Sequence, residues 1–286
     1  MALLEILSAI FGWVYFLCWS ASFYPQPVLN WGRASTSGTT VDFPFLNVIG
    51  FAAYFASNAA FYYSPTIRAQ YAARHNDLTP TVAFNDIVFA LHGLILSVIT
   101  ASQYLFAKSL WGFPPSVGAR PSRLALGIGN GCVVGVLATV LIVATAGAAD
   151  IDHPARAWCA LDIVYAVGYV KLVVTLVKYV PQMLANWRNK STRGWSIWQI
   201  LLDFSGGILS IAQQGIDSWL QGDWSGITGN PVKFALGNAS MVYDVIFMVQ
   251  HYVLYPGGKG DYDDDDDSRG HQEERQRLMD EERRIA

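Results

Sequence analysis

Charged and amide side chains recur at helical spacing within a stretch that is otherwise apolar. They lie three or four positions apart, at Lys171, Thr175, Lys178, Gln182 and Asn186. Residues with this spacing share one face of a helix. An ionisable side chain inside a hydrophobic span is costly to bury, and by default it marks a substrate or proton pathway. The series therefore predicts a polar cavity lined by this face.

Three further segments carry polar series of the same kind. They comprise Ser22, Gln26 and Asn30; Ser196, Gln199, Asp203, Gly207 and Ser210; and Lys233, Gly237, Ser240 and Asp244. Lysines can bind carboxylates, amides can hydrogen-bond to either end of a polar ligand, and a buried aspartate can bind an ammonium group or carry a proton. Asp203 and Asp244 are the main candidates for proton transfer, and Asp86, at a segment boundary, is a third.

The segments that position these residues have the length and composition of membrane spans. Hydrophobic residues make up 52% of the chain and charged residues only 14%. A helix needs about 20 mostly apolar residues to cross a bilayer. We expect an all-α membrane protein with seven transmembrane helices, at residues 3–24, 43–64, 86–107, 124–149, 157–180, 195–216 and 235–255.

Basic residues are unevenly divided between the loops. The loops after the first, third and fifth spans hold more Lys and Arg than the loops after the second, fourth and sixth. Under the positive-inside rule the first set is cytosolic. We therefore expect a lumenal N-terminus and a cytosolic C-terminus. Residues 257–286 are polar and acidic, which predicts a disordered cytosolic tail.

One motif occurs twice in the chain. Its residues are Pro25, Gln26, Asn30, Trp31, Ser35, Thr36 and Gly38, and all recur 156 positions later, from Pro181 and Gln182 to Gly194. Such self-similarity indicates an internal duplication. We expect parallel three-helix repeats at 1–110 and 153–256, joined by a linker helix at 111–152. Pro25, Gln26, Pro181 and Gln182 are predicted hinges because proline interrupts a helix.

The third spans of the two repeats also share a short string. Residues 85–89 read NDIVF and residues 243–247 read YDVIF, which pairs Asp86 with Asp244. No basic patch suggests nucleic acid as a partner, and no cysteine pair has metal-ligand spacing. We find no nucleophile with a positioned base, so neither an enzyme nor a cofactor nor a metal site is expected.

The duplicated Pro-Gln motif in a seven-span chain resembles the PQ-loop transporters, whose three-helix repeats are similar to those of SWEET sugar carriers. Longer strings resemble the cystinosin branch of this family. They are LVVTLVKYVPQ at 172–182, KST and GWSI within 190–197, LLDF and GG within 201–207, and Asp244 followed by QH at 250–251. The resemblance covers the chain from the first span to the seventh.

The resemblance implies a proton-coupled symporter that exports L-cystine from the lumen of the lysosome or vacuole to the cytosol by alternating access. Its partners would be L-cystine, protons, membrane lipid and cytosolic signalling or sorting-adaptor proteins. Positions that match the family's substrate cavity or its gating are Asn30, Lys171, Lys178, Asn186, Gln199, Asp203 and Lys233. Positions that match its proton-coupling residues are Asp86, Asp203 and Asp244.

Two departures accompany the resemblance. Gln199 stands where animal members carry Asn, so it keeps the amide and adds a methylene. The chain is also expected to be a form without the long lumenal N-terminal region of those members.

Two other functions fit the same architecture. A PQ-loop carrier for another amino acid or a sugar is one, although lysines inside the spans disfavour cationic substrates and charge pairs disfavour a neutral sugar. A seven-helix sorting or signalling receptor is the other, and such a receptor would bind its ligand without net transport.

Overall fold

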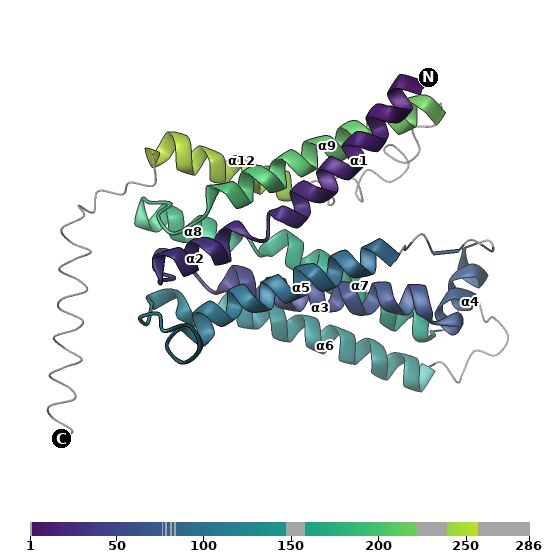
Figure 1. Cartoon of the computed structure of the whole chain (residues 1–286). Coiled ribbons are helices and arrows are strands. Elements are labelled where there is room, and N and C mark those ends of the chain that lie inside the picture. Colours follow the sequence, from purple (N-terminus) through teal and green to yellow (C-terminus); the bar gives the residue numbers. More distant parts are fainter. Residues whose placement is uncertain are drawn as a thin grey trace, which may run out of the picture.

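The computed structural model describes residues 2–146, apart from residues 76, 78, 81 and 83, together with residues 158–221 and 239–256. Within these residues the chain is helical and contains no strand (Figure 1). The predicted tail at 257–286 and Lys233 lie outside the described residues. The helices are α1 (Ala2–Ala21), α2 (Pro25–Arg33), α3 (Asp42–Tyr63), α4 (Pro65–Arg74), α5 (Phe84–Leu105), α6 (Arg123–Ala146), α7 (Ala160–Val177), α8 (Val180–Asn189), α9 (Ile197–Gln221) and α12 (Ala239–Val249). Three short segments are helices of other types: the π-helices η1 (Ala107–Trp111) and η3 (Gln250–Leu254) and the 3₁₀ helix η2 (Val117–Ala119).

Five of the seven predicted spans are long and apolar enough to cross a membrane. They are Leu3–Arg33, Asp42–Tyr63, Phe84–Leu105, Arg123–Thr145 and Ala160–Asn189. α12 and η3 form a shorter apolar helix, Ala239–Leu254. α9 is 25 residues long but carries Gln199, Asp203, Gln213 and Asp217, which lower its hydropathy. The sixth and seventh spans therefore remain predictions.

The helices of the two halves pack against each other in a reciprocal way. α1 from the first half packs along α9 from the second, and α7 from the second half packs along α3 from the first. Because α1 corresponds to α7 and α3 corresponds to α9, these are the same contact made twice. Figure 1 shows α1, α9 and α12 together on one side of the bundle, with α3, α5, α6 and α7 on the other.

The first and fifth spans are both broken at the predicted positions. α1 ends at Ala21 and α7 ends at Val177, each four residues before the proline, Pro25 or Pro181. Each proline lies in the first turn of the next helix, where its missing N–H would have had no partner in any case. The predicted kinks are therefore confirmed, while hinge motion stays a prediction.

Two glycine loops meet where α2 and α8 end, and we call this place the loop end of the bundle (residues 34–41 and 190–196). Gly38 and Gly194 have φ angles of 84° and 88°, in the left-handed region. A Cβ on Gly38 would lie 2.2 Å from the Arg193 carbonyl oxygen, and a Cβ on Gly194 would lie 2.3 Å from that of Ser37. Only glycine allows the two loops to approach this closely.

Replacing either glycine should therefore destabilise the protein. We expect Gly38→Ala and Gly194→Ala each to cost about 2 kcal/mol or more, because both backbone conformation and space oppose a Cβ. The melting temperature of the detergent-solubilised protein should fall by about 4 °C or more. Gly127→Ala is the matched control, since a Cβ there meets nothing within 4 Å. Equal melting temperatures for all three variants would contradict the tight loop contact.

Candidate functional site

A cavity of about 380 Å³ lies between the two halves of the bundle. The first half supplies aromatic and neutral polar side chains, namely Trp19, Ser22, Phe23, Gln26, Phe43, Asn47, Phe51, Tyr54, Phe89, Ser97, Thr100 and Tyr104. The second half supplies the charged ones, Lys171, Lys178 and Asp203, together with Thr175, Tyr179, Trp195, Gln199 and Ser240. Four of the predicted ligand-binding residues are therefore brought together: Lys171, Lys178, Gln199 and Asp203.

The two lysines contact the cavity wall through aromatic rings. The Lys171 Nζ lies 3.6 Å from the centroid of the Phe51 ring, and the Lys178 Nζ lies 4.6 Å from that of Tyr179. Aromatic faces attract cations. Neither ammonium group forms an ion pair with a described carboxylate within 4 Å. Their N–H donors are thus available to an anionic group on a ligand.

Asp203 is fixed at the wall by its neighbours. The Tyr179 hydroxyl donates a 2.7 Å hydrogen bond to Asp203 Oδ2. The indole N–H of Trp19, on the opposite half, donates to the Asp203 backbone carbonyl at 3.2 Å. The carboxylate therefore has a defined position, and among the described residues only the Tyr179 hydroxyl bonds to it, so that Oδ1 faces no described donor.

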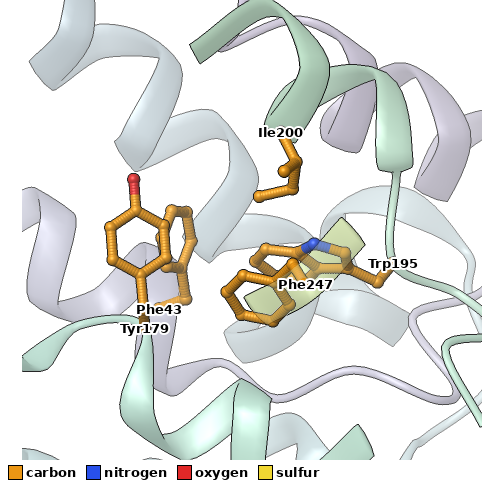
Figure 2. Close-up of a cluster of buried hydrophobic side chains, with 5 residues drawn as sticks. All are labelled: Phe43, Tyr179, Trp195, Ile200 and Phe247. Carbon is orange, nitrogen blue, oxygen red and sulfur yellow. The ribbon is translucent and has the colours of Figure 1, made fainter. Parts of the chain in front are cut away.

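An aromatic cluster lies beside the cavity, near the loop end of the bundle. Figure 2 shows Phe43, Tyr179, Trp195, Ile200 and Phe247 converging there, with the rings of Trp195 and Phe247 stacked. Phe43, Tyr179 and Trp195 also line the cavity.

Asp244 is completely buried and has no hydrogen-bond partner on either carboxylate oxygen. It lies on α12, in the same helix as the cluster residue Phe247, and does not line the cavity. Transfer of a carboxylate from water without new donors is strongly unfavourable. A proton on Asp244 removes most of that cost.

Asn30 and Asn186 were predicted to belong to the substrate cavity or its gating, but their side chains lie in the protein interior, away from the cavity lining. Both are fully buried and neither lines the cavity. Asn30 accepts from Gln26 Nε2 at 2.9 Å and donates to Gln103 Oε1 at 2.9 Å. Asn186 accepts from Gln182 Nε2 at 2.8 Å and donates to Gln250 Oε1 at 3.1 Å. In this conformation both amides are structural.

Gln26 and Gln182, the two predicted hinge glutamines, each bind the loop of the opposite half. Gln26 donates to the Gly194 carbonyl at 2.9 Å and accepts from the Ser196 N–H at 2.8 Å. Gln182 donates to the Gly38 carbonyl at 3.5 Å and accepts from the Thr40 N–H at 3.0 Å. Each glutamine therefore ties the two halves together at the loop end.

Two further hydrogen bonds show that the sequence match paired the wrong residues of the third helices, α5 and α12. Gln103 donates to the Pro27 carbonyl, and Gln250 donates to the equivalent Met183 carbonyl. These glutamines are 147 positions apart, so the residue that corresponds to Asp244 is Ser97 and not Asp86. Asp86 lies in the first turn of α5, half-buried and outside the cavity lining.

Sequence reasoning missed Asn47 and Ser97 as ligand-binding candidates. Both line the cavity and both carry a buried oxygen without a partner. Asn47 stands 156 positions before Asp203, so the duplication offered a signal for it. Among the residues that the structure describes, no cluster of three His, Cys, Asp or Glu side chains could hold a metal ion.

Comparison with known proteins agrees with the duplicated architecture. The family model of the PQ loop repeat matches residues 7–67 and 163–221, which begin at the same 156-residue offset. Cystinosin from Drosophila melanogaster is 42% identical over 250 residues, covering 87% of this chain, and the chain spans 58% of that protein's length. A cystinosin homolog from Dictyostelium discoideum is 36% identical over 91% of this chain and 86% of its own length.

A more distant relative has a name that states its activity. The cystine transporter of Saccharomyces cerevisiae is 25% identical over 88% of this chain and 95% of its own length. The resemblance in sequence to the cystinosin branch is therefore confirmed by whole-length relatives: the chain belongs to the PQ-loop family and, within it, to the cystinosin group.

Proposed function

We propose that the protein is a proton-coupled symporter that exports L-cystine by alternating access from an acidic lysosomal or vacuolar lumen to the cytosol. The observation that carries the proposal is the cavity between the PQ-loop repeats, whose wall combines Lys171, Lys178 and Asp203. Cystine bears a carboxylate and an ammonium group at each end, and these residues offer cations for one and an anion for the other. The names of the relatives support the same substrate.

The volume and lining also suit an elongated amphipathic ligand. Ligand cavities of about 300 Å³ or more hold small molecules, and most are apolar with few convergent polar groups. Here the aromatic rings of Trp19, Phe23 and Phe51 can contact the disulfide and methylene centre of cystine. Sulfur makes favourable contacts with aromatic rings.

Proton coupling is assigned to Asp203 and Asp244, with Asp86 as a third candidate. Asp203 reaches the cavity directly, whereas Asp244 lies behind it without a partner. A carboxyl group can couple to transport when one conformation favours its protonated form and the other favours its ionised form. The buried position of Asp244 favours a proton in the conformation with a closed loop end.

The closed loop end is the cytosolic end in this proposal, because it carries Arg33, Arg188 and Lys190. The N-terminus would then be lumenal. Release of the hydrogen bonds of Gln26 and Gln182 would open the cavity to the cytosol, with Pro25 and Pro181 as hinges. Lys233 and the adaptor-binding tail belong to the proposal on the resemblance alone.

Transport can be tested in reconstituted vesicles. Vesicles loaded with labelled cystine at acidic internal pH should release it into neutral buffer faster than vesicles without the protein. A competition panel of cystine, lysine, arginine and glucose distinguishes cystine from the other PQ-loop substrates. Saturable binding without net release would instead support the receptor alternative.

Asp244→Asn should abolish the acceleration of cystine release by an acidic interior, because an amide cannot exchange the proton. The measurement is initial release with and without a pH difference. Asp77→Asn, at a loop residue far from the cavity lining, is the control and should retain the full acceleration. An unchanged pH response in Asp244→Asn would remove this residue from the coupling mechanism.

Lys178→Met should weaken cystine binding by about tenfold or more, since a hydrogen bond to a charged group contributes about 1.5–3 kcal/mol. The methionine keeps most of the apolar length of the side chain and removes the ammonium group, which lies 4.6 Å from the centroid of the Tyr179 ring. Ligand-induced thermal shift or calorimetry gives the affinity. Lys108→Met, at an exposed position, serves as control. Retained affinity in Lys178→Met would show that the cation does not contact substrate.

A further inference from the structure

Two oxygens in the first half of the cavity lack partners. They are Asn47 Oδ1 and Ser97 Oγ, on side chains that are only 4% and 3% exposed. Both residues line the cavity. A buried polar atom without a hydrogen bond costs about 1–3 kcal/mol. A ligand that donates hydrogen bonds to these two oxygens would recover this free energy.

Ser97 differs in this respect from the other hydroxyl residues of its own helix and of α3. Thr100 donates to the Leu96 carbonyl at 2.8 Å, Ser102 donates to Ile99, and Ser57 donates to Tyr54. Such bonds to the preceding turn are the usual way in which a helix satisfies a buried hydroxyl. Ser97 makes none, so its hydroxyl is left available to the cavity.

The two oxygens belong to the same part of the wall. α3 and α5 are antiparallel neighbours, and a Cβ on Gly93 of α5 would lie 2.6 Å from the Phe51 ring of α3. Asn47 lies one turn before Phe51, and Ser97 lies one turn after Gly93. In antiparallel helices these positions face each other, because residues four apart share one helix face.

The chemistry of this pair differs from that of the second half. Lys178 and Asp203 offer a cation and an anion, whereas Asn47 Oδ1 and Ser97 Oγ offer two neutral acceptors. Two neighbouring acceptors fit an ammonium group, which carries three donors and no acceptor. A neutral site also avoids placing a second carboxylate close to Asp203.

We propose that Ser97 positions the substrate by accepting a hydrogen bond, beside Asn47, from the ammonium group of the amino-acid end that lies away from Lys178 and Asp203. The inference rests on the proposed function. It assigns the two ends of a symmetric substrate to chemically different halves of the cavity. Lys178 and Asp203 hold one end by ion pairing. At the other end Asn47 and Ser97 face the ammonium group, and Lys171, whose Nζ lies 3.6 Å from the centroid of the Phe51 ring, faces the carboxylate.

The test pairs a protein variant with trimmed ligands. The ligands are cystine, the mixed disulfide of cysteine and cysteamine, and the mixed disulfide of cysteine and 3-mercaptopropionate. The second lacks one carboxylate but keeps both ammonium groups, and the third lacks one ammonium group. Affinities are measured by calorimetry on the purified full chain, for the wild type and for Ser97→Ala.

Ser97→Ala should weaken binding of cystine and of the cysteamine disulfide by about tenfold, and leave the 3-mercaptopropionate disulfide unchanged. Ser97→Thr keeps the hydroxyl and should restore most of the affinity for cystine. Ser57→Ala is the matched control, since this buried hydroxyl is bonded to the Tyr54 carbonyl within its helix and does not line the cavity. It should change none of the three affinities by more than about twofold.

Equal weakening of all three ligands, or no weakening of any, would overturn the assignment of Ser97. Failure of the wild type to bind cystine would instead overturn the proposed function, so the two failures are distinguishable. If Ser97→Ala does not fold, Ser97→Cys supplies the same comparison, because a thiol is a much weaker acceptor of similar size.

Discussion

The reciprocal hydrogen bonding of Gln26 and Gln182 is the constraint on which the rest of the structure depends. Each side-chain amide leaves its own half and binds the backbone of the opposite loop. Both glutamines are buried, so an amide left without these partners would cost about 1–3 kcal/mol. The bonds can form only if the loops approach closely, which requires glycine at positions 38 and 194. They also engage Asn30 and Asn186, and thereby remove these amides from the cavity.

This scaffold is symmetric between the halves, but the charge of the site is not. Three pairs of corresponding residues differ in the same sense: Ser22 and Lys178, Asn47 and Asp203, and Ser97 and Asp244. In each pair the first half keeps a neutral polar side chain and the second half has an ionisable one. The duplicated elements thus form the bundle, and the differences between the two copies supply the charges.

The sequence predicted the elements better than it predicted the site. Hydropathy located five of the seven predicted spans, and the two prolines located the helix breaks, because both depend on local composition. Asn30 and Asn186 were predicted to bind ligand because the sequence does not distinguish a polar residue that lines a cavity from one that bonds to other side chains in the interior. The match of residues 85–89 with 243–247 paired Asp86 with Asp244, whereas the true register of the third helices is set by bonds between distant segments. Ser97 carries no sequence signal, because only the folded structure shows that its hydroxyl lacks the usual helix carbonyl.

The reciprocity of the two glutamines also determines how the loop end can open. Gln26 is carried by the first half and Gln182 by the second, yet each bonds to both its own asparagine and the opposite loop. Separating the loops therefore breaks the bonds of both glutamines at once. Intermediate states would leave buried amide and backbone groups without water or partners, which makes them unfavourable. In the proposed alternating access, the closed and fully hydrated arrangements are the two low-energy states, and the helix breaks before Pro25 and Pro181 are the proposed hinges between them.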